Sequence, residues 1–95
     1  MKWAEVIMLR SGGSRRKLRD AILKDMMNEV FIESEHQSIR VFHHEQLPSD
    51  ICIVLFHSST TVRTEGSILG LHLVSALKEV GLVNHTVWNE INQTK

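Results

Sequence analysis

The sequence predicts an α+β domain of the ferredoxin-like class, with its elements in the order β-α-β-β-α-β. Four short apolar runs have the length of strands, and two longer segments repeat apolar residues at helical spacing. Right-handed crossovers then place both helices on one face of a four-stranded antiparallel sheet. Because 95 residues suffice for one domain, we expect a single unit over 1–95 with a frayed tail at 92–95.

The first half of the chain predicts a strand, a helix and a second strand. Residues 3–9 form a nearly continuous apolar run, too short for a helix, that ends at the Ser-Gly-Gly-Ser sequence of 11–14. Ser14 is a candidate N-cap for a helix whose apolar residues recur four apart. Residues 39–45 are rich in β-branched and aromatic side chains and predict the second strand. The apolar stripe of the helix consists of Leu18, Ile22, Met26 and Val30.

The second half predicts a hairpin, a helix and a last strand. Residues 46–50 include the single proline and join the second strand to a third at 51–57. After a polar loop, Ser67 can cap the second helix, and Gly81 is expected to end it in a left-handed conformation. Residues 82–91 predict the fourth strand. The apolar stripe of this helix consists of Leu69, Leu73, Ala76, Leu77 and Val80.

The strands lack the alternation of a sheet that is half exposed, because both phases of 3–9 and 51–57 are apolar. If the aliphatic phase faces the helices, as Ala4, Val6 and Met8 would, most of the aromatic residues lie on the opposite face. A soluble monomer rarely leaves so large an apolar face in water. We therefore expect a symmetric homodimer, packed sheet to sheet around a barrel-like interior. The predicted open face carries Trp3, Glu5, Ile7, Arg40, Phe42, His44, Cys52, Val54, Phe56, Thr86 and Trp88.

The closing segment, 66–88, reads GSILGLHLVSALKEVGLVNHTVW. It resembles the second helix and last strand of the dimeric α/β-barrel superfamily, in particular of small bacterial proteins similar to the antibiotic biosynthesis monooxygenase family. The resemblance covers most of the chain and implies the barrel fold and the homodimer. It also implies a choice of activities, including cofactor-independent oxygenation of aromatic polyketides and haem degradation. Branches that depend on a catalytic tyrosine are excluded, because the chain contains no Tyr.

Polar groups on the predicted open face are the candidates for chemistry. Glu5 and His44 are the candidate catalytic residues, because an apolar cavity can move the pKa of a carboxyl or imidazole group toward neutrality. A structural ion pair among Glu5, Arg40 and His44 is the alternative. The candidate ligand-binding residues, for a flat apolar or aromatic molecule, are Trp3, Arg40, Phe42, Phe56, Thr86 and Trp88.

Composition limits the partners that we expect. Eleven basic and eleven acidic residues balance, which gives no support to binding of nucleic acid or of an anionic membrane. Cys52 is the only cysteine, so no disulfide within the chain can form, and a reducing, cytoplasmic location is expected. The six histidines lack the spacing of a metal motif, and neither a metal nor another cofactor is expected.

The first helix is expected to begin with Arg15, Arg16, Lys17 and Arg19, the reverse of the charge that a helix dipole favours. A solvated basic end and an anion site are the two interpretations.

Two functions from different classes remain. The first is a homodimer that binds a small apolar or aromatic molecule and acts as a cofactor-independent, monooxygenase-like enzyme. The alternative is a structural or regulatory dimer without catalysis, whose barrel is filled by its own side chains. A cavity that contains Glu5 or His44 would favour the first function.

Overall fold

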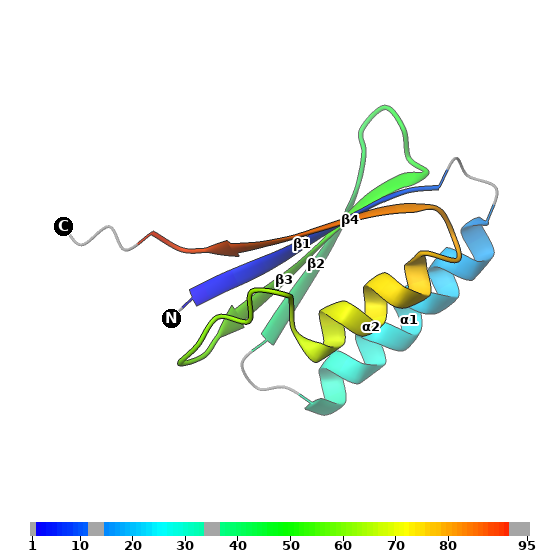
Figure 1. The fold of residues 1–95 in the computed structure, drawn as a ribbon. Coiled ribbons are helices and arrows are strands. Elements are labelled where there is room, and N and C mark those ends of the chain that lie inside the picture. The colour runs from blue at the N-terminus through cyan, green and yellow to red at the C-terminus, as the bar shows by residue number, and fades with distance from the viewer. Residues whose placement is uncertain (1, 12–14, 34–36, 92–95) are drawn as a thin grey trace.

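The computed structural model describes residues 2–11, 15–33 and 37–91. It confirms the predicted order of elements in an α+β, ferredoxin-like fold (Figure 1). The expected N-cap at Ser14 and the tail at 92–95 lie outside the described residues. The elements are β1 (Lys2–Arg10), α1 (Arg16–Glu33), β2 (Gln37–His43), β3 (Asp50–Ser58), α2 (Ile68–Leu77) and β4 (Leu82–Asn89).

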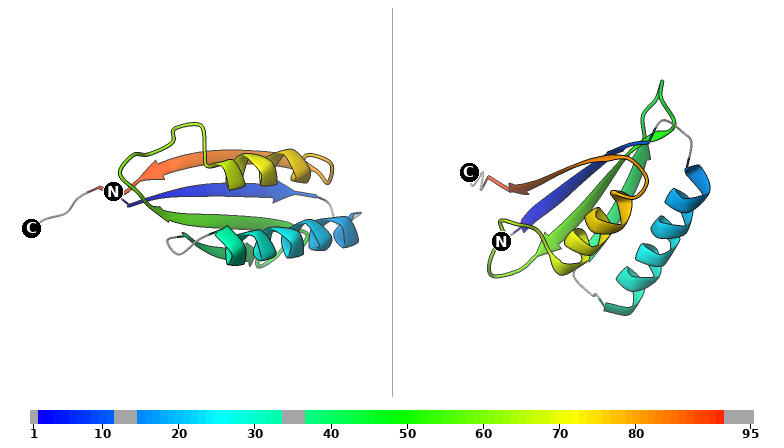
Figure 2. Two further views of the ribbon diagram at one scale, coloured as in Figure 1. Left: turned by 90° about the horizontal axis from the view of Figure 1, so that it is seen from below. Right: turned by 45° about the vertical axis from the view of Figure 1, so that its right-hand side comes forward.

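The four strands form one antiparallel sheet in the order β2-β3-β1-β4. Both helices lie on the same side of this sheet, as predicted (Figures 1 and 2). The second helix, α2, packs on β1 and β4, while α1 contacts β2 and α2. The opposite side of the sheet is left without a covering element among the described residues, and we call it the open face.

The hydrophobic core lies between the sheet and the helices. Burial of each large apolar side chain there stabilises the fold by about 1.5 to 3 kcal/mol. In the predicted helix stripes, Ile22 and Ala76 are half-buried and Leu18 at the start of α1 is exposed, while the side chain of Val30 lies outside the described part of the structure. The other stripe residues are buried: Met26, Leu69, Leu73, Leu77 and Val80. The buried core residues are Ile7, Leu9, Met26, Ile51, Ile53, Leu55, Leu69, Leu73, Leu77 and Val80.

The predicted orientation of β1 is wrong, whereas β2, β3 and β4 are oriented as predicted. Trp3, Glu5 and Ile7 face the helices and are buried, and Ala4, Val6 and Met8 lie on the open face. Both phases of β1 are apolar, so alternation does not choose between them. The observed choice places the larger side chains of Trp3, Ile7 and Leu9 where the space between sheet and helices must be filled.

The ends of α2 show which sequence signals were read correctly. Ser67 is the N-cap, and its Oγ accepts a hydrogen bond of 2.9 Å from the backbone N–H of Gly70. Gly81, however, is not left-handed: Gly66, with φ of 109°, is the only described glycine with positive φ. A Cβ at Gly81 would lie 2.3 Å from the backbone oxygen of Arg10, so this glycine permits a close approach of two chain segments.

The basic start of α1 is tied to neighbouring backbone. Arg15 donates to the carbonyl oxygen of Glu79 at 2.8 Å, beyond the end of α2, where carbonyl groups lack partners. Arg19 donates to the carbonyl oxygen of Ser49 at 3.3 Å in the β2–β3 connection. These contacts give two of the four cations a structural role.

No helix in the described parts of the chain is long and apolar enough to cross a membrane.

Candidate functional site

The open face is organised in rows of residues that pair directly across the strands. A central row contains Val54 and Val6, with Arg40 and Thr86 at its ends. On one side lies a row of Phe42, Cys52, Met8 and Asn84, and on the other a row of Phe56, Ala4 and Trp88. Charged residues lie at both ends of the open face: Arg10 pairs with Asp50 at one end, and Lys2 lies beside Glu90 at the other.

Two hollows occupy the outer rows of this face. The first, of about 350 Å³, lies beside the β2–β3 connection and is lined by Met8, Phe42, Leu47 and Cys52 among others. The second, of about 370 Å³, lies at the opposite end of the sheet and is lined by Ala4, Phe56 and Trp88 among others. Both volumes are within the range of sites for small molecules.

The predicted ligand-binding residues are therefore divided among different places. Phe42 lines the first hollow, and Phe56 and Trp88 line the second. Arg40 and Thr86 lie at opposite ends of the central row, separated by two strands. The orientation expected for Trp3 was wrong: its ring faces the helices, stacks on the His57 ring at 4.1 Å and donates to Ser59 Oγ.

Glu5 lies at the centre of a buried polar cluster beneath the N-terminus of α2. Its side chain is completely buried, and three side chains from distant parts of the sequence donate to its carboxylate. Nε2 of His57 on β3 lies 2.6 Å from Oε2, Nε2 of His85 on β4 lies 2.9 Å from Oε1, and the Ser67 hydroxyl lies 2.5 Å from Oε2. The cluster joins β1, β3 and β4 to the start of α2.

Electrostatics keep this carboxylate ionised. Burial alone would raise the pKa of Glu5, but the hydrogen bonds from His57, Ser67 and His85 and from the Ser67 backbone lower it from 4.5 to about 2. The positive end of the α2 dipole acts in the same direction. The three donors give Glu5 a structural role in joining the sheet to α2. Its predicted catalytic role stays a prediction.

The lowered pKa of Glu5 predicts acid destabilisation. Ionised Glu5 stabilises the folded state above its unfolded pKa of 4.5, and this contribution is lost as the pH falls toward the folded value of about 2. A difference of two to three pKa units corresponds to about 3 kcal/mol. We expect urea unfolding to show that the wild type loses this much free energy of unfolding between pH 5 and pH 2, whereas Glu5→Gln does not. An equal dependence of the free energy of unfolding on pH in the two proteins would contradict the prediction.

Two glycines leave room for the carboxylate. A Cβ at Gly70 would lie 2.0 Å from Oε1 of Glu5, and a Cβ at Gly66 would lie 2.5 Å from Cε1 of His85. Gly66 also has the positive φ that other residues rarely adopt. The Gly66–Gly70 segment is therefore shaped around the Glu5–His85 pair.

His44, the second predicted catalytic residue, lies just beyond β2 at the edge of the first hollow. Its Nδ1 accepts hydrogen bonds from the backbone N–H groups of Gln46 at 3.0 Å and Leu47 at 3.1 Å. A nitrogen that accepts carries no proton, so in the neutral ring the proton is on Nε2. In this tautomer the Nε2–H group of His44, a residue that lines the first hollow, is a hydrogen-bond donor. Its predicted catalytic role stays a prediction.

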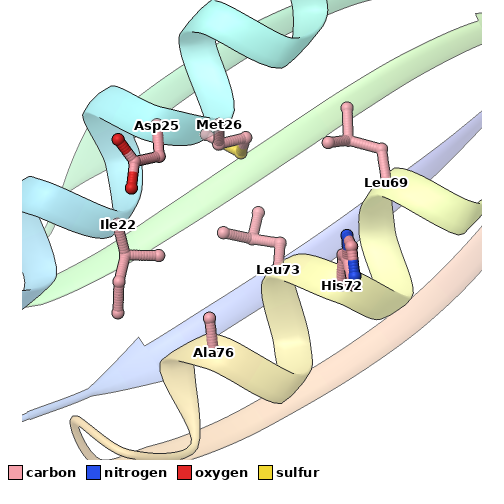
Figure 3. Close-up of a pocket in the computed structure, with 7 residues that line it drawn as sticks. All are labelled: Ile22, Asp25, Met26, Leu69, His72, Leu73 and Ala76. Atoms are coloured by element: carbon pink, nitrogen blue, oxygen red, sulfur yellow. The ribbon is translucent and has the colours of Figure 1, made fainter.

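A third hollow, of about 240 Å³, lies between the two helices. Figure 3 shows Leu69, Leu73 and Ala76 of α2 facing Ile22 and Met26 of α1, with Asp25 and His72 as its polar residues. Its apolar walls continue the core, and nothing in its lining repeats the polar cluster around Glu5.

No group of three His, Cys, Asp or Glu in the described ranges is arranged to hold a metal ion.

Solved structures share this architecture. Rv0793 from Mycobacterium tuberculosis superimposes with a TM-score of 0.72 over 100% of both chains at 15% sequence identity. An antibiotic biosynthesis monooxygenase-like protein from Caulobacter crescentus gives 0.70 at 8% identity, over 96% of this chain and 91% of the other. SnoaB from Streptomyces nogalater, a cofactor-independent oxygenase, gives 0.70 at 6% identity, over 98% and 96%.

The chain has the antibiotic biosynthesis monooxygenase-like fold. The likeness concerns architecture, since identities of 6% to 15% carry no residue roles from one chain to another. No protein-family model matches the sequence, and no curated protein matches it.

Within this monooxygenase-like fold, the sequence interpretation missed the three partners of Glu5. His57, Ser67 and His85 are 52, 62 and 80 residues away from Glu5, so no local pattern connects them. A usable signal was present, because His57 and His85 share the helix-facing phase assigned to β3 and β4. If β1 had been assigned the opposite orientation, Glu5 would have been expected on the same face of the sheet as His57 and His85.

Proposed function

We propose that the chain forms a homodimer through the open face of its sheet and holds a small apolar or aromatic molecule between the two copies. The exposure of four large apolar side chains on one surface carries this proposal: Trp88 is 60% exposed, Phe42 51%, Met8 48% and Phe56 43%. An apolar centre with charged residues at both ends is the composition of a protein interface.

The energetics favour association. A standard interface buries about 800 Å² per partner, which at about 25 cal/mol per Å² gives a gross stabilisation on the order of tens of kcal/mol. Loss of translational and rotational freedom opposes this by about 4 to 15 kcal/mol. The balance supports a dimer at micromolar concentrations, with the two hollows of each copy enclosed at the interface.

Sedimentation velocity of the wild type and of Trp88→Lys tests the dimer. Lysine at this position would place a charge in the apolar row of Phe56, Ala4 and Trp88, so we expect a wild-type dimer and a monomeric variant. Ile68→Lys is the matched control, because Ile68 is 69% exposed but lies on α2. A monomeric wild type with native circular dichroism would refute the proposed dimer.

The activity that we propose is cofactor-independent oxygenation of an electron-rich aromatic molecule. Its support is the fold shared with SnoaB together with apolar hollows of suitable size. In such a reaction the substrate itself reduces O2: one oxygen atom enters the product and the other leaves as water. Oxygen uptake with a panel of polycyclic phenols, without added flavin, nicotinamide or metal, tests the activity.

A non-catalytic dimer is the second candidate, and a specific observation favours it. Both predicted catalytic residues are engaged: Glu5 accepts three side-chain hydrogen bonds, and Nδ1 of His44 accepts two from the backbone. Ligand binding by a stable dimer without any oxygen uptake would support this candidate.

A cytoplasmic location is part of the proposal. Its support is Cys52, a free thiol on the open face whose pKa is raised by burial. A thiol in a dimer interface is best preserved in a reducing compartment.

A further inference from the structure

The first hollow combines an apolar floor with a polar edge. Phe42, Cys52 and Met8 form the floor as one row across β2, β3 and β1. Leu47 closes it from the β2–β3 connection. The next row holds the polar side chains that line the same hollow, His44, Asp50 and Arg10.

His44 presents a fixed donor at this edge. Because its Nδ1 accepts the backbone N–H groups of Gln46 and Leu47, Nε2 carries the ring proton and can only donate. The backbone also holds the residue in place, since the His44 N–H donates to the carbonyl oxygen of Asp50 at 2.8 Å.

Asp50 presents an acceptor beside this donor. Its side chain is 20% exposed, and its Oδ2 lies 3.7 Å from Nε of Arg10. Arg10 balances the charge of the carboxylate without enclosing it, since the Arg10 side chain is 73% exposed. The titratable groups along the hollow are Arg10, His43, His44, Asp50 and Cys52.

His43 belongs to the opposite phase of β2, and its Nδ1 donates to the carbonyl oxygen of His44 at 3.2 Å. Arg10 balances the charge of Asp50, and burial raises the pKa of the Cys52 thiol. The edge therefore presents the Nε2 donor of His44 beside the carboxylate acceptor of Asp50. A neutral ligand fits this edge better than an ion.

We propose that this hollow binds a neutral apolar molecule whose polar end carries one hydrogen-bond donor and one carbonyl oxygen, read by Asp50 and His44 respectively. The inference rests on the proposed function in that the ligand lies on the open face. It adds two specificity-determining residues and assigns the ligand to one hollow of the two.

Binding of meta-hydroxyacetophenone and acetophenone to the full chain, followed by amide chemical shifts, tests the proposal. In the meta isomer the hydroxyl group cannot bond to its own carbonyl, so both groups are free for Asp50 and His44. We expect the hydroxylated compound to bind about tenfold more tightly, the value of one additional hydrogen bond of about 1.4 kcal/mol.

Two variants separate the donor from the acceptor. In His44→Asn the side-chain oxygen can take over the N–H groups of the turn, as asparagine does in such turns, but the donor at Nε2 is lost. Both probes should then bind about tenfold more weakly. Asp50→Ala, which removes both acceptor oxygens, should abolish most of the preference for the hydroxylated probe. Ser75→Ala, at an exposed position of α2 on the other side of the sheet, is the control and should leave both affinities within twofold.

The outcomes distinguish this inference from the proposed function. Equal affinities for the two probes in the wild type, or shifts confined to residues around Trp88, would overturn the assignment to the first hollow and leave the dimeric binding protein standing. Failure of both probes to bind a folded dimer would overturn ligand binding itself. Retained protection of the Gln46 and Leu47 amides from hydrogen exchange in His44→Asn would verify that the turn is intact.

Discussion

Gly70→Ala is expected to destabilise the folded protein by about 3 to 5 kcal/mol, the size of effect seen when a buried charged pair is broken. The new Cβ would lie 2.0 Å from Oε1 and 2.7 Å from Cδ of Glu5. Glu5 cannot move aside without giving up its bonds to His57, Ser67 and His85. Helix propensity acts in the opposite direction, because alanine is favoured over glycine within a helix by about 1 kcal/mol.

Urea unfolding followed by tryptophan fluorescence measures this effect, and a double-mutant cycle identifies its cause. Because Glu5→Ala removes the atoms that the new Cβ would meet, the double variant should be about as stable as Glu5→Ala alone. Ser75→Ala, at an exposed position of α2, is the control for helix propensity. Wild-type stability in Gly70→Ala would show that the clash is relieved by another movement.

The order and extent of the elements could be predicted because local chemistry determines them. The Ser67 cap and the apolar stripe of α2 determine structure within a few residues of their own positions. The predicted strands differ from the observed ones mainly at their ends, as for β4, predicted to end at Ile91 and observed to end at Asn89. Strand ends depend on pairing with distant segments, which a local pattern does not contain.

The orientation of β1 and the Glu5 cluster could not be predicted in the same way. Ala4 and Val6 are as apolar as Trp3 and Ile7, so the choice of phase depends on the volume to be filled between sheet and helices. A single acidic residue in an apolar strand is expected to be exposed to solvent, because burying an isolated charge costs free energy. The partners that make its burial tolerable come from β3, β4 and the loop before α2.

The open face was predicted correctly on the three strands where one phase is clearly aliphatic. Phe42, Phe56 and Trp88 lie on it as expected, and only the β1 residues had to be exchanged. The tautomer of His44, by contrast, follows from the conformation of the Gln46–Leu47 turn. Turn geometry of this kind requires coordinates, so the donor at Nε2 of His44 could not be predicted from the sequence.

Glu5→Ala is the second substitution with a large expected effect. It removes the acceptor of three buried donors at once, so His57, Ser67 and His85 keep desolvated N–H and O–H groups without their partner. We expect a loss of about 3 to 5 kcal/mol in the free energy of unfolding. A chain of this size has a total stability of about 5 to 14 kcal/mol, so the variant should fold but unfold at much lower urea.

Two further readouts separate a structural anchor from a dispensable charge. The acid dependence between pH 5 and pH 2 should disappear in Glu5→Ala, because it comes from the lowered pKa of this one carboxyl group. Asp20→Ala, which removes a carboxylate that is 61% exposed, should change stability by less than about 0.5 kcal/mol. Because the proposed dimer would add stability that depends on protein concentration, all proteins are compared at one concentration. Retention of wild-type stability and acid dependence in Glu5→Ala would mean that the cluster does not hold α2 to the sheet.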